Sequence, residues 1–183
     1  MNGHSPGFSL AEARGRWTGF EVDYCRAYAA ALFNDAEKVR FVEVTATDRF
    51  TALQSGRIDV LLRNTVWSNE WEAEYGLLAT GAIFYDGQGF LVRKAQKITG
   101  AGELGRRSIC VERGTMNEVN LTEYFGSQVK AIVFPEHKEA LKAYDAQACD
   151  ALTDNQSSLH VDRLSLARMD DHTVMPDIIS RVR

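Results

Sequence analysis

Three short segments combine hydroxyl, amide and charged side chains at points where a predicted strand ends and a helix begins. They are 63–68 (RNTVWS), 113–117 (RGTMN) and 153–157 (TDNQS). Open parallel sheets bind ligands at the carboxyl ends of their strands, and the free N–H groups of helix N-termini favour anions such as carboxylates. Thr115, Asp154 and Ser157 also suit simple helix caps. Three such loops in one chain favour a small-molecule cleft over capping alone.

The signals for catalysis and metal binding are weak. The chain contains neither a Gly-x-Ser-x-Gly elbow nor a phosphate-binding Gly-x-x-x-x-Gly-Lys loop. His137 opens a helix rich in charged residues, which predicts a solvated position and not a general base. Cys25, Cys110 and Cys149 form no Cys-x-x-Cys pair, and the four histidines lack ligand spacing, so we expect no metal site and no cofactor. From the residues alone, the cysteines are interpreted as small buried apolar side chains.

Two tryptophans and three glutamates follow the first of these loops. Trp67 and Trp71 fit two interpretations equally, stacking on a ligand or filling an interface between lobes. Glu70, Glu72 and Glu74 would crowd like charges onto one face of a strand, so we predict a polar loop there.

Strand and helix signals alternate along most of the chain. The predicted helices are 18–33, 48–55, 116–126, 136–147 and 156–167, and the predicted strands are 38–44, 58–62, 108–112, 130–134 and 149–153. This alternation predicts an α/β fold with mostly parallel sheets. The apolar, glycine-interrupted stretch 76–94 breaks the rhythm and predicts a crossover between two lobes, with a boundary near residue 87.

The composition is typical of a globular protein and excludes several classes. The 183 residues include 21 Lys+Arg and 25 Asp+Glu, a net charge of −4, which argues against a nucleic-acid partner. Hydrophobic residues make up 45 % of the chain, enough for a core, yet no apolar run approaches the ~20 residues that span a bilayer. The first residues show no secretion signal, which fits either a cytoplasmic chain or a trimmed signal.

Four longer strings identify a family resemblance. GRWTGFEVDYCRAYAAALF, DRFTALQSGRIDVLLRNTVW, FYDGQGF and MPDIIS resemble periplasmic general (polar) L-amino-acid-binding proteins of ABC importers, from about Pro6 to Ser180. The resemblance implies a two-lobed periplasmic-binding-protein fold of type II, with lobe one at 1–87, lobe two at 88–180 and a tail at 181–183. It also implies a periplasmic location, a small-molecule ligand such as an amino acid, and delivery to a membrane permease.

The polar loops and the resemblance together give a set of candidate ligand-binding positions. They are Phe8, Arg63, Asn64, Thr65, Trp67, Trp71, Thr115, Asn117, Asp154 and Asn155. In the family an arginine clamps the ligand carboxylate and an aspartate holds its ammonium, but Trp71 and Asn155 stand at these two positions. Met116 replaces a loop threonine, and Asp154 lies one residue upstream of the expected aspartate. Losing one member of a buried ion pair costs on the order of 3–5 kcal/mol, so we expect weakened amino-acid binding.

Further expectations follow from the resemblance. Relatives begin earlier and continue further, so lobe one is expected to be incomplete, to expose apolar surface and to pair with a second copy. Cys110 and Cys149 fall in strands expected to be neighbours, which makes a disulfide bond an option. The preferred function is a solute-binding protein with an altered pocket, and the alternative is a non-binding remnant with an oligomeric or regulatory role. An enzyme built on this fold ranks lowest, because Asp154 is the sole obvious acid.

Overall fold

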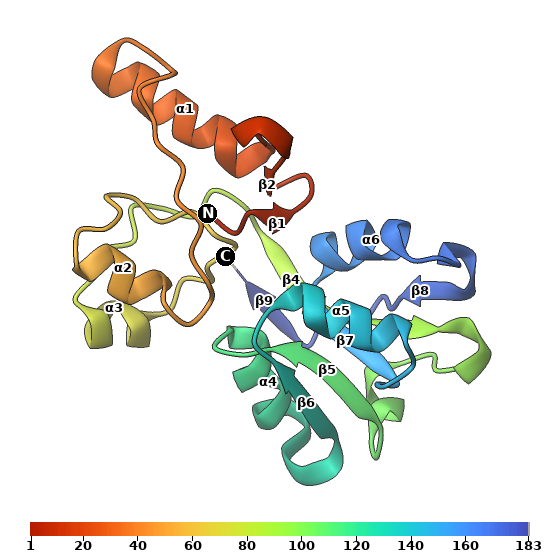
Figure 1. The fold of residues 1–183 in the computed structure, drawn as a ribbon. Coiled ribbons are helices and arrows are strands. Elements are labelled where there is room, and N and C mark those ends of the chain that lie inside the picture. Colours follow the sequence, from red (N-terminus) through yellow and green to blue (C-terminus); the bar gives the residue numbers. More distant parts are fainter. Residues whose placement is uncertain (183) are drawn as a thin grey trace. The chain divides into compact units, whose positions relative to one another are not determined.

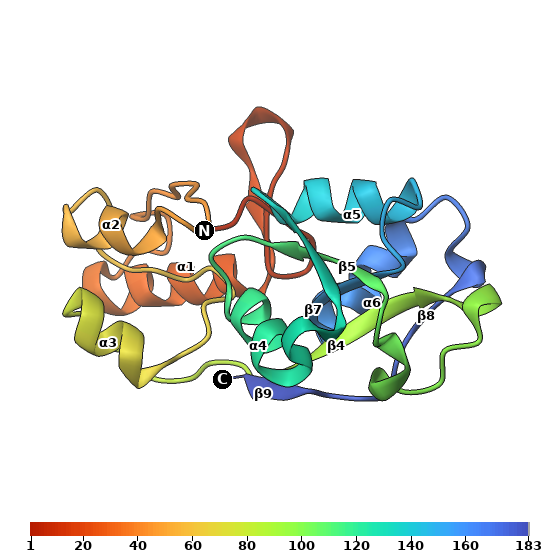
Figure 2. The ribbon, with the colours of Figure 1, turned by 90° about the horizontal axis from the view of Figure 1, so that it is seen from below.

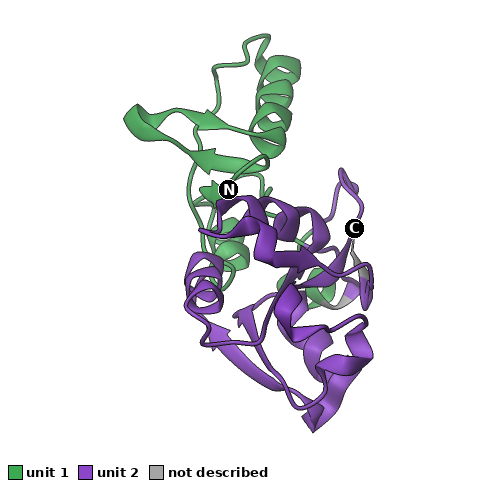
Figure 3. Cartoon of the chain, turned by 90° about the vertical axis from the view of Figure 1, so that its right-hand side faces the viewer, with its two compact units in different colours: residues 1–65, 70–77 green, residues 66–69, 78–183 purple. Residues whose placement is uncertain are grey.

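The computed structural model describes residues 1–182, with side chains at all of these except 70, 181 and 182. The chain forms two compact units (Figure 3): unit 1 comprises residues 1–65 and 70–77, and unit 2 comprises residues 66–69 and 78–183. The expected lobe boundary near residue 87 remains a prediction. Each unit is described by itself.

A mixed six-stranded sheet forms the centre of unit 2 (Figure 1). Its order is β6-β5-β7-β4-β8, with β9 also paired to β4; β5, β6 and β7 run parallel, whereas β4 runs antiparallel to β7, β8 and β9. The strands are β4 (Asp86–Arg93), β5 (Ser108–Glu112), β6 (Lys130–Phe134), β7 (Ala151–Asn155), β8 (His172–Val174) and β9 (Ser180–Val182). The predicted α/β architecture is therefore confirmed. The expectation of mostly parallel sheets is wrong, because β4 pairs antiparallel with three strands.

Helices cover both faces of this sheet (Figure 2). They are α4 (Met116–Phe125), α5 (His137–Asp145) and α6 (Gln156–Ser165). One core cluster joins Leu121 and Phe125 of α4 to Phe90 of β4, and the other joins Tyr144 of α5 and Leu159 of α6 to the opposite face. Short 3-10 turns lie at Lys94–Gln96, Ala101–Leu104, Gly126–Gln128 and Met169–Asp171. Because β5, β6 and β7 run parallel, the loops that follow them lie at the same edge of the sheet.

A disulfide bond joins Cys110 of β5 to Cys149, just before β7, with the two Cα atoms 5.7 Å apart. The pairing that the family resemblance suggested is confirmed. The interpretation of both residues as simple buried apolar side chains is wrong, although each is fully buried in the cluster beneath α5 and α6. Cys25 lies outside the disulfide, half-buried in helix α1 (Phe20–Phe33) of unit 1.

Unit 1 combines a small antiparallel sheet with three helices. The strands β1 (His4–Ser5), β2 (Ser9–Ala11) and β3 (Trp17–Thr18) pair in sequence order, with a 3-10 turn at Ala13–Gly15. The helices are α1 (Phe20–Phe33), α2 (Arg49–Gln54) and α3 (Asn69–Tyr75). Gly19 precedes α1 with φ 120°, and a Cβ there would lie 2.4 Å from the carbonyl oxygen of Phe8. Glycine therefore permits the close approach of these two backbone segments.

Two predicted strands and one predicted loop are wrong. Residues 38–44 and 58–62, all of them described, lie outside the strands of the structure. Their apolar residues instead form a small core in which Val44 and Ile58 pack with Ala52 of α2. The N–H of Val44 bonds to the carbonyl of Met1, and that of Ile58 to Ala52, so these amides find partners without a continuous ladder.

The segment with the three glutamates is helix α3 and not a polar loop. Trp71 and Tyr75, one helical turn apart, both contact the ring of Phe50, with centroid distances of 5.0 and 4.7 Å. This spacing favours a helix because it places both aromatic rings on one face. Within the described residues, no helix combines the length and the apolar character needed to cross a membrane.

Candidate functional site

In unit 1 a buried carboxylate holds two of the predicted ligand-binding loops. Glu21, in the first turn of α1, accepts bonds from the Ser9 hydroxyl (2.7 Å) and from the backbone N–H of Asn64 (2.6 Å). Asn64 has a left-handed backbone with φ 44°, and its side-chain amide lies 3.5 Å from the hydroxyl of Ser5. The N–H of Glu21 also donates to the carbonyl of Phe8. Phe8 and Asn64 are thus positioned by one residue that the sequence argument did not single out.

The neighbours of Asn64 are engaged within unit 1. Arg63 is buried, and its Nε donates to the carbonyl oxygen of Val44 at 2.8 Å. The hydroxyl of Thr65 donates to the carbonyl of Arg63 at 3.3 Å. Both side chains therefore stabilise the loop that presents Asn64.

The two predicted tryptophans have different environments. Trp71 in α3 packs edge-on against Phe50, and the Arg49 guanidinium lies 4.9 Å from its ring centroid. Trp71, which stands where the family resemblance implies an arginine, thus joins the packing between α2 and α3. Trp67, which belongs to unit 2, is exposed.

In unit 2, Thr115 caps α4. Its hydroxyl accepts the N–H of Glu118 at 3.3 Å and donates to the carbonyl of Glu112 at 2.8 Å, while Glu118 accepts the N–H of Gly114 at 2.7 Å. The carboxylate of Glu118 therefore already accepts one of the backbone N–H groups at the N-terminal end of α4.

Asn117 links the start of α4 to the end of β7. Its side-chain Nδ2 donates to Oδ1 of Asp154 at 2.8 Å, and its backbone carbonyl accepts from the buried Gln88 at 2.9 Å. Asp154 Oδ1 also accepts the N–H of Asn155 at 2.7 Å. The structure thus brings together three of the predicted residues, Asn117, Asp154 and Asn155.

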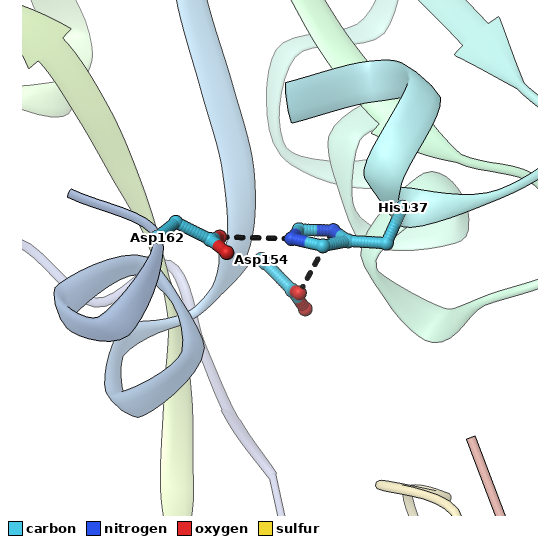
Figure 4. A group of neighbouring side chains, drawn as sticks. All are labelled: His137, Asp154 and Asp162. Atoms are coloured by element: carbon cyan, nitrogen blue, oxygen red, sulfur yellow. Dashed lines mark hydrogen bonds and ion pairs between the residues drawn. The ribbon is translucent and has the colours of Figure 1, made fainter. Parts of the chain in front are cut away.

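The same carboxylate meets a histidine that the sequence argument placed in solvent. Figure 4 shows the His137 ring between two carboxyl groups: Nδ1 lies 3.1 Å from Oδ2 of Asp154, and Nε2 lies 2.8 Å from Oδ2 of Asp162. The His137 side chain is only 18 % exposed. The prediction of a solvated His137 is therefore wrong. The charged neighbours Glu136 and Lys138 suggested solvent, but His137 follows β6 at the same sheet edge as the other loops.

Electrostatics favour a protonated imidazole in this cluster. Burial alone lowers the pKa of His137, but the charges of Asp154 and Asp162 and the bond to Asp162 outweigh it and raise the pKa to about 10. Burial raises the pKa of Asp154 to about 6, although the charge of His137 opposes this rise. The negative charge of Glu112 raises both pKa values by a smaller amount. The cluster is an internal ion pair at neutral pH.

A metal ion could in principle draw on the same three side chains. One ligand atom from each of His137, Asp154 and Asp162 lies within 4.8 Å of the others. Metal coordination requires a deprotonated ring nitrogen, whereas both nitrogens here face carboxylate oxygens at hydrogen-bond distance. The geometry suits an imidazolium better than a metal ligand.

Two neutral acceptors lie beside the ion pair. Asn117 and Asn155 are 6 % and 9 % exposed, and the side-chain Oδ1 of each has no hydrogen-bond partner among the residues that the structure describes. Buried acceptors without a partner are uncommon and costly, by about 1–3 kcal/mol each. These oxygens are suited to a hydrogen-bond donor from a bound molecule.

Comparisons with known proteins agree with this architecture. Residues 1–162 match the family model of bacterial extracellular solute-binding proteins, family 3. The general L-amino acid-binding periplasmic protein AapJ of Rhizobium johnstonii is 45 % identical over 178 residues, which cover 96 % of this chain and 52 % of AapJ. The putative amino-acid ABC transporter-binding protein YhdW of Escherichia coli K12 is 40 % identical, with 96 % and 52 % coverage.

Solved structures show the same fold. A periplasmic binding protein of an ABC transporter from Brucella ovis, with glutathione bound, superimposes with a TM-score of 0.94 at 45 % identity. The match covers 99 % of this chain and 58 % of that one. The chain thus spans about half the length of the curated relatives it matches. The expected periplasmic-binding-protein fold is confirmed, and the chain belongs to family 3 of the bacterial extracellular solute-binding proteins.

Proposed function

We propose that this chain acts in the periplasm as a solute-binding receptor for an amino acid or a related small molecule, with weaker amino-acid binding than its relatives. Its relatives AapJ and YhdW carry amino-acid binding in their names, and the Brucella relative holds glutathione. An ABC permease is the proposed membrane partner, and the function is transport and not catalysis.

The arrangement around Asp154 is the observation that carries the proposal of weakened binding. Asn155 stands where the family resemblance implies an aspartate, and the carboxylate one residue upstream is occupied by Asn117, Asn155 and His137. Asp154 therefore does not supply a free countercharge for a ligand ammonium. Trp71 packs against Phe50 and supplies no charge for a carboxylate. Neither unit therefore offers a zwitterion the charged anchor that the family resemblance implies for it.

Restoring the anchors tests this proposal. Isothermal titration with the twenty standard amino acids and glutathione compares the natural chain with Asn155→Asp, Trp71→Arg and the double variant. We expect the double variant to bind an amino acid at least about 100-fold more tightly than the natural chain, because a restored buried pair contributes about 3 kcal/mol. Val119→Asp, an exposed position in α4, serves as the control for an added charge. Tight binding by the unaltered chain contradicts the proposal.

The exposed face of α1 favours a second candidate, an oligomeric or regulatory protein that binds no solute. Tyr28, Leu32 and Phe33 of this helix are exposed, with Leu32 at 71 %. Exposed apolar side chains that gather on one element are typical of interaction surfaces. Solute titrations that remain silent for every variant, together with stable self-association in light scattering, favour this candidate.

A further inference from the structure

Three carboxylates and one histidine lie near one another in unit 2, close to the carboxyl ends of its parallel strands. Asp154, Asp162 and Glu112 contribute three carboxylates, and His137 contributes the one cation that lies between two of them. These groups come from β7, α6, β5 and α5. The charge of His137 is shared inside the unit, so neither of the carboxylates that it contacts needs an external partner.

Both oxygens of Asp154 are occupied. Oδ1 accepts two N–H groups, from Asn117 Nδ2 at 2.8 Å and Asn155 N at 2.7 Å, and Oδ2 faces His137 Nδ1 at 3.1 Å. A ligand ammonium at Oδ2 of Asp154 would compete with the imidazolium, a group also held by Asp162 at 2.8 Å. Displacement would break the His137–Asp154 pair to form one new pair, so it would bring no net gain of buried ion pairs.

Two neutral acceptors lie beside Asp154. The Oδ1 atoms of Asn117 and Asn155 are buried acceptors without a partner among the described residues. A neutral amide oxygen bonds well to an uncharged N–H or O–H donor, but it compensates poorly for the desolvation of an ammonium.

We infer that His137 is a specificity-determining residue, which keeps the charge of Asp154 inside unit 2 and leaves neutral amide acceptors for the ligand. The preferred ligand class is a small molecule that presents an uncharged amide N–H or hydroxyl where an amino acid presents its ammonium. This inference rests on the proposed function and names the substrate class of that site. His137 acts through Asp154 and does not need to touch the ligand.

A matched pair of probes tests the ligand class. L-glutamine and N-acetyl-L-glutamine differ at one group, a charged ammonium in the first and a neutral amide N–H in the second. Isothermal titration measures both affinities for the natural chain, His137→Gln and His137→Lys. We expect the natural chain and His137→Lys to favour the acetyl compound, because both keep the internal cation. In His137→Gln the ratio of affinities shifts toward L-glutamine by about tenfold or more, since one unpaired carboxylate is exposed to the ligand.

A second variant assigns the shift to the intended carboxylate. Adding Asp154→Asn to His137→Gln removes the charge and is expected to restore the preference for the acetyl compound. An unchanged ratio in His137→Gln, or a natural chain that favours L-glutamine, overturns the inference while leaving solute binding intact. Binding of neither probe by any variant overturns both the ligand class and the receptor function.

One measurement tests the ion pair without any ligand. The imidazole C–H signals in NMR report the charge of each histidine in the natural chain and in Asp154→Asn. We expect His137 to remain protonated at about pH 8 in the natural chain. In Asp154→Asn its pKa should be lower than in the natural chain, because the charge of Asp154 is removed. A His137 signal that titrates near the ordinary histidine range in both proteins overturns the inference alone, whatever the probes show.

Discussion

The ion pair of His137 makes the stability of unit 2 depend on pH. The folded state raises the pKa of His137 from 6.5 to about 10, so it binds a proton that the unfolded chain releases above 6.5. The contribution is complete below pH 6.5 and is lost as the pH rises through 10. The raised pKa of Asp154, about 6 against 3.8, acts in the same direction at lower pH.

We therefore expect the free energy of unfolding to fall on the order of a few kcal/mol between about pH 7 and 10. In His137→Gln the same interval should be nearly flat, because the titrating group is absent. Urea denaturation of both proteins at several pH values measures this slope. His160→Gln, at an exposed histidine of α6, is the control and should follow the natural chain. Equal slopes in all three proteins would contradict the prediction.

Glu21 has a comparable role in unit 1, where it accepts bonds from Ser9 and Asn64 while 4 % exposed. Glu21→Ala leaves the buried Ser9 hydroxyl and the partly buried N–H of Asn64 without their acceptor, and we expect a loss of stability of about 1–3 kcal/mol. The Asn64 amide should also exchange its hydrogen faster, since its bond to Glu21 is gone. Asp23→Ala removes an exposed carboxylate from the same helix turn and should change neither value. Exchange at Asn64 that is equal in both variants would exclude the positioning role.

At the scale of elements, the sequence predicts unit 2 better than unit 1. The strands β5 and β6 begin and end where the pattern placed them, because a strand packed between two helix layers reads as a short apolar run. The predicted strands at 38–44 and 58–62 have a similar pattern, but their apolar residues pack around α2 without a paired ladder. Periodicity reports which side chains are buried, and strand formation also requires a neighbouring strand for the backbone.

The candidate site shows the same limit of local patterns. Asn117, Asp154 and Asn155 lie in loops that the strand–helix alternation marks, and the structure brings them together. His137 and Asp162 were missed because α5 and α6 approach each other only in the folded unit, 25 residues apart in sequence. The sequence signal that could have indicated this cluster is a histidine at the start of the helix that follows a parallel strand.

The disulfide bond joins Cys110 to Cys149 across 39 residues, and its removal tests how much it contributes to the stability of unit 2. We expect the double variant Cys110→Ala/Cys149→Ala to lose about 2–4 kcal/mol, because the unfolded chain gains freedom and two buried sulfur atoms are removed. Chemical denaturation measures the loss, and Cys25→Ala outside the bond should change stability far less. Thiol titration of the unfolded natural chain should find one free thiol before reduction and three afterwards; three before reduction would contradict the bond.

The entry into α1 depends on one close backbone approach. Gly19→Ala places a Cβ 2.4 Å from the Phe8 carbonyl oxygen and also imposes a strained φ of 120°. Gly15→Ala provides the matched control, because its φ of 77° is also positive but no atom lies within 4 Å of the added Cβ. We expect Gly19→Ala to destabilise unit 1 by several kcal/mol and Gly15→Ala by about 1–2 kcal/mol, as measured by thermal unfolding. Similar losses would show that the contact with Phe8 is unimportant.

At the scale of the whole molecule, the two units differ in the size of their apolar cores. Unit 2 contains both large core clusters, whereas unit 1 holds a smaller one around Val44 and leaves much of α1 exposed. Exposed apolar surface of this kind is typical of a protein–protein contact, and the partner that we predict from the sequence is a second copy of the chain.

Self-association through α1 is the prediction that follows from this surface. Leu32→Glu places a charge on the exposed end of α1, so we expect the natural chain to elute as an oligomer and this variant as a monomer. Leu164→Glu is the matched control, because Leu164 of α6 is 63 % exposed against 71 % for Leu32. Size-exclusion chromatography with light scattering at micromolar concentration separates the outcomes. A monomeric natural chain contradicts self-association, and an oligomer that Leu164→Glu alone disrupts would place the contact on unit 2.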